Sequence, residues 1–538
     1  MDYIFETRPY WSEIGIPEAK VKRKYIEYFG SDKVKIDNRE EAIIYLSKIT
    51  GEIQLKLTNF MKNFNTCNLV KDLYKILDEA FHFYIAQKKV RHEFVTHNIQ
   101  DENITDVFEE NKNKSRNVID SVNLWLENCL LFQDSVEEYD SKSFKLNEDL
   151  FVEMYIYGVA SQALSLLSMS KKFDKEILFT GIEVNYKDDT PVKLTKYHPI
   201  IYYNTALTGN QNVLNEDTEL ARANESDFGK KFKETYNVEF IDSLRVMSTL
   251  QAELLHNGKY AMTIIDKEQF IKEITRYGVV DAEAFFETFV LTKKKIKSQL
   301  KKKDPIIWVM NSNKYRHEIR PFICLENNRI YISYCAMEQA KQLWCSIYMN
   351  GGMCYSNSED ELTRAINRRN KELSDKLVEL IRDKLRAHYT ATFDEIDVKY
   401  DRIFGVKDIN YGDYDVVFYT KDSNELFLIE AKFFSDSLNN SGIISDYEKM
   451  FKKNGYYEHC RSRYDLVIQE KEKMKKYIGA EGEIKVHFLF VSSKPLEIEF
   501  QDSDKVVTFP CLSILDKYIE GKLYSENGKH IIRPVHIL

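Results

Sequence analysis

Apolar residues recur at three- and four-residue spacing from about residue 18 to residue 170. This spacing predicts successive amphipathic helices, because it gathers the apolar side chains on one face of each helix. The clearest examples are VKDLYKILDEAFHFYIAQKKV, which starts at Val70, and SRNVIDSVNLWLENCLLF, which starts at Ser115. We therefore expect residues 1–175 to form a helical domain with a regulatory or assembly role.

The pattern changes near residue 178, where LFTGIEVNYKDDTPVKLTKYHPIIYY alternates β-branched and aromatic residues around the turn-forming DDTP. This alternation predicts a strand pair. Helical periodicity returns over residues 227–303, and HEIRPFICLENNRIYISYC then predicts a hairpin about residues 326–328, followed by a helix at 336–348. Glycines at 351 and 352 break the pattern, so we expect a mixed α/β middle domain over residues 176–355.

The pattern of apolar and polar positions in the last part of the chain, residues 356–538, predicts an α/β domain. A long helix is expected at 358–389, and strands at 392–398, 414–420 and 425–433, the last two joined by turn residues 421–424. A second helical stretch at 446–477 and a buried strand at 484–491 follow. The fold class expected for the whole chain is α+β and multidomain, with the order helix, three strands, helix, strand in its C-terminal part.

Composition agrees with an ordered, helix-rich protein. Among 538 residues there are only 19 glycines and 9 prolines, with 43% hydrophobic and 30% charged residues. No apolar run reaches the roughly 18 residues of a membrane span, and the N-terminal residues lack the features of a signal peptide. We therefore expect a cytoplasmic protein that does not bind a membrane. The eight cysteines form no C-x-x-C pair, which indicates reduced structural thiols.

The net charge of −8 is unevenly distributed. Residues 101–150 contain thirteen acidic and five basic residues, so this segment accounts for the whole imbalance and the remainder is neutral. A basic surface patch can therefore exist elsewhere on the protein despite the negative net charge. The richest basic run is LTKKKIKSQLKKK at residues 291–303, for which we favour a solvated helix face over a phosphate-binding one.

Candidate chemistry lies on the second and third expected strands of the C-terminal part. Side chains alternate along a strand, so Glu430 and Lys432 share one face of ELFLIEAKFF, and Asp413 and Asp415 share one face of YGDYDVVFY. Charges at the end of an apolar strand are costly to bury unless a partner such as a divalent cation compensates them. Asp415 and Glu430 could supply oxygen ligands to Mg²⁺, and Lys432 could hold the attacking water.

These motifs resemble the PD-(D/E)XK nuclease superfamily, whose core is a helix, a three-stranded meander, a helix and a further strand. The resemblance covers roughly residues 358–495. It implies that Asp415 and Glu430 bind Mg²⁺ (or Mn²⁺), with the Ala431 carbonyl as a further ligand, and that Lys432 is the catalytic lysine. Asp413 is the alternative to Asp415, which we prefer because it directly precedes the apolar run of residues 416–418.

The same resemblance implies further residues. Many members place an acid on the first helix, and Glu372 and Glu379 are both candidates here. Four basic residues on the following helical stretch could contact a phosphate backbone or simply form a charged solvent face. They are Lys449, Lys452, Arg461 and Arg463.

A Glu-x-Lys tripeptide has little meaning without its context. The same tripeptide at Glu18–Lys20 follows a proline and has no preceding strand, so we expect it to lie at the surface. The structural alternative at Glu430 is an ion pair of Glu430 and Lys432 with their neighbours. Isolated histidines are expected to be core or surface residues. Arg316 and Arg320 could bind phosphate or brace the 326–328 hairpin, and we favour bracing.

The expected function is that of a Mg²⁺-dependent endonuclease that hydrolyses DNA in bacterial restriction or anti-phage defence. The chain has no P-loop motif, so an ATPase or sensor would be a separate partner. A homo-oligomer is expected because cutting both strands requires two active sites. The alternatives are a nuclease for repair, recombination or RNA, and an inactive nuclease-like scaffold or nucleic-acid-binding protein.

Overall fold

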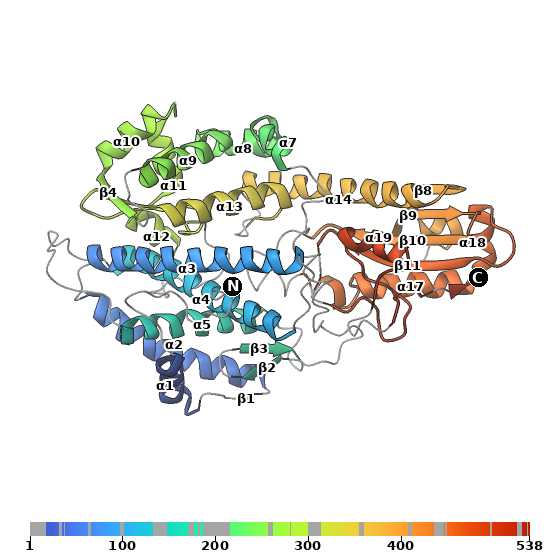
Figure 1. Ribbon diagram of the computed structural model, residues 1–538, viewed down its shortest axis with the longest axis horizontal. Helices are drawn as coiled ribbons and strands as arrows, with labels where there is room; N and C mark the ends of the chain where they lie inside the picture. The colour runs from blue at the N-terminus through green and yellow to red at the C-terminus, as the bar shows by residue number, and fades with distance from the viewer. Residues whose placement is uncertain are drawn as a thin grey trace.

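The computed structural model shows an α+β protein (Figure 1). The residues that it describes are 18–31, 35–36, 38–62, 66–96, 102–132, 148–169, 177–180, 183–186, 216–256, 262–279, 281–299, 314–353, 360–406, 412–434, 446, 449–494, 496, 498–524, 530–534 and 536–538. In this part of the chain, no helix combines the length and the apolar character needed to cross a membrane.

The expected N-terminal helices are confirmed. They are α1 (Glu18–Phe29), α2 (Arg39–Lys62), α3 (Thr66–Thr96), α4 (Glu102–Phe132) and α5 (Glu148–Met169). A small antiparallel sheet accompanies them, with strands β1 (Lys35–Ile36), β2 (Ile177–Thr180) and β3 (Glu183–Tyr186) in that order. Strands β2 and β3 form a strand pair at the start of the expected region, but both precede the DDTP segment that was predicted as the turn. The DDTP segment lies outside the described residues.

The middle part combines helices with a four-stranded mixed sheet in the order β4-β7-β6-β5. Its strands are β4 (Met262–Asp266), β5 (Val290–Leu291), β6 (Phe322–Cys324) and β7 (Arg329–Ser333). Its helices are α7 (Glu216–Ala221), α8 (Asp227–Tyr236), α9 (Phe240–His256), α10 (Lys267–Arg276), α11 (Ala282–Phe289), α12 (Lys293–Gln299) and α13 (Tyr334–Asn350), with the short 3-10 helix η4 (Ala223–Glu225).

The β6–β7 hairpin and helix α13 confirm the sequence-based expectation, but β4 and β5 interrupt a stretch predicted to be helical. Both strands are short, and their pairing partners β7 and β6 lie far along the chain, so local periodicity gives no sign of them. Gly351 ends α13 with a φ of 60°, a left-handed conformation that favours glycine.

The C-terminal part contains a five-stranded mixed sheet in the order β12-β11-β10-β9-β8. Its strands are β8 (Phe393–Lys399), β9 (Asp413–Thr420), β10 (Glu425–Lys432), β11 (Lys485–Ser492) and β12 (His536–Ile537). Its helices are α14 (Glu361–His388), α15 (Tyr400–Phe404), α17 (Tyr456–Gln469), α18 (Lys471–Ile478) and α19 (Leu515–Ile519), with the 3-10 helix η5 (Leu512–Ile514). The elements predicted for this region are therefore present in the predicted order.

Helices cover both faces of this sheet. Strands β8, β9 and β10 form an antiparallel meander, and β11 returns parallel to β10 after α17 and α18. On one face, Leu377 and Ile381 of α14 pack with Phe427 and Ile429 of β10. On the other, α17 and α18 pack against alternate residues of the same strands. The centre of the sheet is thus buried, so we expect a site that binds ligands to lie at the ends of its strands.

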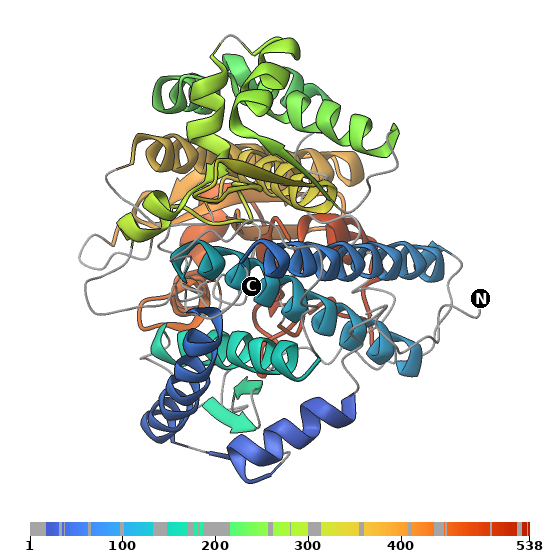
Figure 2. The ribbon, with the colours of Figure 1, turned by 90° about the vertical axis from the view of Figure 1, so that its left-hand side faces the viewer.

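Hydrophobic clusters cross the positions at which domain boundaries are predicted. The first cluster joins Leu73 and Trp125 of the N-terminal helices to Tyr331 and Cys335 of the middle part. Helix α14 contributes Ile366 to the core of the middle part, and its later residues pack on the C-terminal sheet. Figure 1 shows this helix extending from one part to the other, and Figure 2 shows the middle part lying along α3. The three-domain division stays a prediction.

Candidate metal-binding and catalytic site

The pairing of β9 with β10 brings Asp415 and Glu430 together. The antiparallel register runs from Glu425–Thr420 to Ile429–Val416, and these two acids are the next residue on each strand. The Ala431 backbone N–H donates a hydrogen bond of 2.6 Å to Asp415 Oδ2. Both residues are buried, with 9% of the surface of Asp415 and 8% of that of Glu430 exposed. Local strand register therefore fixes two buried acids side by side at the end of the meander.

Strand alternation also places Lys432 beside them. Ile429 and Ala431 belong to the cluster under α14, whereas Leu428 belongs to the cluster under α17 and α18. Glu430 and Lys432 continue the second series, so they face α17. The Lys432 Nζ lies 2.6 Å from Glu430 Oε1 and 3.1 Å from Asp415 Oδ2. One ammonium thus bridges the two carboxylates.

A fourth charge completes the cluster. Arg463 of α17 is buried, its Nη1 lies 2.6 Å from Glu430 Oε2, and the same nitrogen donates a hydrogen bond to the Asp413 carbonyl. Two acids and two bases therefore balance one another without a further ion. The ion pair proposed as the structural alternative is present, and it is compatible with a catalytic site as well as with a purely structural one.

The cluster perturbs the pKa values of its members. Burial, followed by the charge of Glu430, raises the pKa of Asp415 to about 6. Burial also acts to raise the pKa of Glu430, but the charges of Arg463 and Lys432 outweigh it and hold that pKa below its usual range. The pKa of Lys432 is raised, because the two carboxylates outweigh the effect of its burial. A carboxyl group with a raised pKa beside an ionised carboxylate is typical of functional sites.

The donor set fits a divalent cation. Two carboxylates converge on one positive charge, the Lys432 ammonium, which marks a position where a cation is favoured. Glu430 Oε2 is buried and lies 2.6 Å from Arg463 Nη1, which leaves a further lone pair because a carboxylate oxygen has two. Asp415 Oδ1 bonds to no residue within the described ranges, and Ala431 and Lys432 both contact Oδ2. Both carboxylates therefore retain lone pairs for a ligand.

The structure does not bring the first-helix acids to this cluster. Glu372 pairs with Arg369 at 3.1 Å and Glu379 pairs with Lys376 at 2.9 Å, both within α14. Both side chains are exposed, and α14 covers the sheet face opposite to Lys432. Asp413 reaches the cluster through its backbone carbonyl, which binds Arg463.

The four basic residues suggested for phosphate contact have different environments. Arg463 lies inside the charge cluster and is not a surface residue. Arg461 is held by Asp502 at 2.9 Å and by Asp504 at 3.1 Å. Lys449 is exposed and 3.3 Å from Asp446, and Lys452 is exposed. Sequence reasoning missed the role of Arg463, although its spacing from Cys460, Leu466 and Val467 places it on the buried helix face.

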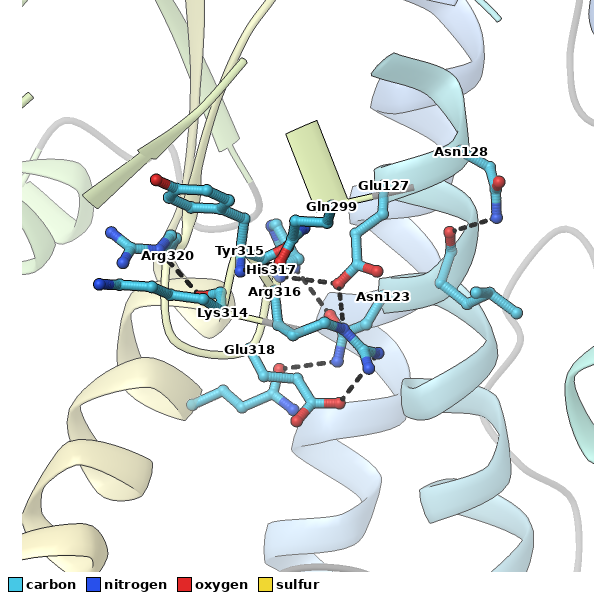
Figure 3. Close-up of polar contacts among 12 residues, drawn as sticks. Asn123, Glu127, Asn128, Gln299, Lys314, Tyr315, Arg316, His317, Glu318 and Arg320 are labelled. Atoms are coloured by element: carbon cyan, nitrogen blue, oxygen red, sulfur yellow. Dashed lines mark hydrogen bonds and ion pairs between the residues drawn. The ribbon is translucent and has the colours of Figure 1, made fainter. Parts of the chain in front are cut away.

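The other polar residues singled out in the sequence are structural. Buried His487 contacts the Tyr518 hydroxyl and Glu425. Figure 3 shows Arg316 directed at Glu127 of α4, whose Oε1 accepts 2.8 Å hydrogen bonds from Arg316 Nε and from the His317 backbone N–H. Arg316 therefore braces the middle part against α4, which differs from the predicted bracing of the 326–328 hairpin. Of the basic run, residues 293–299 form α12, and Lys293 and Lys295 pair with acids.

Arg320 is almost fully buried, and its guanidinium lies near the rings of two tyrosines, Tyr236 and Tyr315. Its Nε donates to the Lys314 carbonyl, on the side of the segment away from Glu127 (Figure 3). Arg320 therefore stabilises the segment that precedes β6, and these contacts do not involve the hairpin that it was predicted to brace.

A second group of possible metal ligands was not anticipated. Asp78, His82 and Cys335 each offer one ligand atom, and these atoms all lie within 4.8 Å of one another. Burial, followed by the charge of Asp78, raises the pKa of Cys335. The spacing of Asp78 and His82 on one helix is visible in the sequence, but Cys335 follows more than 250 residues later, so only the fold reveals the group.

No family model, no curated protein and no solved structure matches the chain.

Proposed function

We propose that the chain is a metal-dependent nuclease of the PD-(D/E)XK type, with its active site at Asp415, Glu430 and Lys432. The observation that carries this proposal is the convergence of two buried carboxylates and one lysine at the ends of β9 and β10. The order of the surrounding elements, from α14 through the β8–β10 meander and α17 to β11, is also the order expected for that superfamily.

Each residue has a distinct role in this proposal. Asp415 and Glu430 would hold Mg²⁺ or Mn²⁺, with the Ala431 carbonyl as a further ligand. A bound metal of this kind supplies a Lewis acid and lowers the pKa of bound water. Lys432 would orient the attacking water and offset negative charge on the phosphate. Arg463 is a positioning residue, because its ion pair keeps Glu430 ionised and fixed in direction.

DNA is the proposed substrate, and restriction or anti-phage defence is the proposed setting. Both come from the resemblance of residues 358–495 to the superfamily. RNA cleavage and a repair or recombination role are further outcomes of the same chemistry. A scaffold without activity is the competing proposal, and the charge balance of the cluster supports it, since Lys432 and Arg463 already neutralise the two acids.

The test is cleavage of supercoiled plasmid, linear duplex, single-stranded DNA and RNA by the purified full chain, with Mg²⁺, Mn²⁺ or EDTA. Lys432→Ala and Glu430→Gln are the site variants, and Glu372→Gln is the matched control, because Glu372 is exposed and lies on the other side of the sheet. We expect metal-dependent cleavage that falls at least 100-fold in the site variants and stays unchanged in the control.

Equal cleavage by wild type and site variants would overturn the assignment of the site. Absence of cleavage together with absence of metal binding would favour the scaffold. The substrate that is cut decides between DNA and RNA.

A further inference from the structure

A possible metal site lies where the N-terminal helices meet the middle part of the chain. Asp78 and His82 are four residues apart on α3, so their side chains leave the helix on the same face. Cys335 belongs to the first turn of α13, which packs against α3. Cys335 is buried, Asp78 is half-buried and His82 is exposed. The group is therefore shielded from solvent at Cys335 and open to solvent at His82.

The distances among the three ligand atoms suit tetrahedral zinc. Cys335 Sγ lies 3.0 Å from Asp78 Oδ1 and 3.8 Å from His82 Nδ1, and the last two atoms are 3.5 Å apart. Zinc bonds of about 2.3 Å to sulfur and about 2.0–2.2 Å to nitrogen and oxygen, at tetrahedral angles, require ligand atoms about 3.3–3.6 Å apart. Shifts of about half an ångström or less would produce this arrangement.

We propose that Asp78, His82 and Cys335 bind a zinc ion, with water in the fourth position. A thiolate, an imidazole and a carboxylate together select zinc over Mg²⁺ or Ca²⁺, which prefer oxygen ligands. The open side at His82 provides the entry path and the space for water. This site is built from α3 and α13, so it is separate from the carboxylates of β9 and β10 and does not depend on the proposed nuclease function.

The metal-free arrangement shows what binding has to displace. The Cys335 thiol donates to Asp78 Oδ1, and His82 Nδ1 contacts the Asp78 carbonyl at 2.8 Å, so this nitrogen carries the proton. On binding, the thiol proton is released to solvent and the imidazole proton moves to Nε2, which is free to face water because the ring is exposed. Zinc would then connect α3 with α13 and hold the N-terminal helices to the middle part.

The test replaces zinc with Co²⁺, which reports its ligands by absorption. On addition of Co²⁺ we expect the full chain to show the near-ultraviolet band of one cobalt–thiolate bond, and we expect zinc to abolish the band. The band should disappear in Cys335→Ser and remain in Cys345→Ser, a matched change on the same helix. It should also remain in Asp415→Asn.

The variant His82→Ala keeps the proposal testable if Cys335→Ser fails to fold. His82 is 61% exposed, so its removal should leave the core intact. This variant should bind Co²⁺ at least about tenfold more weakly, since one of three protein ligands is lost. Zinc should raise the unfolding temperature of wild type more than that of His82→Ala. A wild-type protein without the thiolate band, or a band that persists in Cys335→Ser, would overturn the proposal.

Discussion

At the scale of single residues, the candidate active site is a balanced group of charges. Lys432 bridges Asp415 and Glu430, and Arg463 pairs with Glu430 from the opposite side. Burying one of these charges alone would cost several kcal/mol, so each depends on its neighbours. The proposed divalent cation would bind the same two carboxylates as the Lys432 ammonium, through the oxygens that Lys432 does not contact. The cluster is balanced in charge without a metal, and metal binding is what the proposal adds.

The buried acid Glu425, which lies outside this cluster, gives a prediction on the pH dependence of stability. Burial opposes its ionisation, but contacts with His487, Ser423 and Arg533 outweigh burial and lower its pKa from 4.5 to about 2. A lowered folded-state pKa gives stability that is present above the unfolded pKa and is lost as the pH falls toward the folded one. We expect Glu425→Gln to lose about 2 kcal/mol in the free energy of unfolding at pH 7.

Urea unfolding across the acid range checks this prediction. The difference between Glu425→Gln and wild type should shrink as the pH falls from about 5 toward about 2. Glu472→Gln is the control, because Glu472 is 78% exposed and should change stability little at any pH. A Glu425→Gln difference that stays constant over this range would contradict the assigned charge role.

At the scale of elements, the sequence predicts strongly periodic segments well and short strands poorly. Helices α3, α4 and α14 and the β8–β10 meander were predictable because their own residues carry the pattern. Strand β4 was not, because its pairing with β7 decides its conformation.

The same division holds for the candidate site. The alternation along β10 predicts that Glu430 and Lys432 share a face, whereas the contact of Arg463 with Glu430 depends on how α17 packs. The group of Asp78, His82 and Cys335 depends on the packing of α13 against α3, which no local pattern contains.

The junction between α13 and α14 provides a prediction at this scale. Gly351 has a φ of +60°, and a Cβ added there would lie 2.9 Å from the Asn370 Cα of α14. Gly278 has a φ of +89° but nothing within 4 Å of such a Cβ. Gly278→Ala should therefore cost about 1 kcal/mol from backbone strain alone, and Gly351→Ala about 3 kcal/mol because α14 must also move. Thermal unfolding of the two variants measures the difference, and equal losses would contradict the close approach of α14 to Gly351.

At the scale of the whole molecule, the N-terminal helices and the middle part share a hydrophobic cluster and a group of buried polar contacts. Glu127 of α4 receives hydrogen bonds from Arg316 and from the His317 backbone, and His317 also contacts Asn123 and Tyr74. A shared core and a shared polar contact favour cooperative unfolding of the two parts. Their connection is therefore expected to be tight, whatever the function of the C-terminal part.

Glu127→Gln tests this connection. The substitution keeps the shape of the side chain but removes the charge that compensates buried Arg316, so we expect a loss of about 3 kcal/mol in the free energy of unfolding. Glu318→Gln is the control, because Glu318 is more exposed and lies 3.9 Å from Arg316. Circular dichroism during urea unfolding measures both losses. Equal small losses in the two variants would show that Glu127 does not stabilise this junction.

The most direct test of the central claim, that Asp415 and Glu430 form a divalent-cation site, is calorimetric titration of the full chain with Mn²⁺. This measurement requires neither a substrate nor an activating partner. We expect wild type and Asp413→Asn to show a binding event that Asp415→Asn lacks, because within the described residues it is the backbone carbonyl of Asp413 that reaches the cluster. Identical titrations of wild type and Asp415→Asn would contradict the claim and leave the cluster as a structural group of ion pairs.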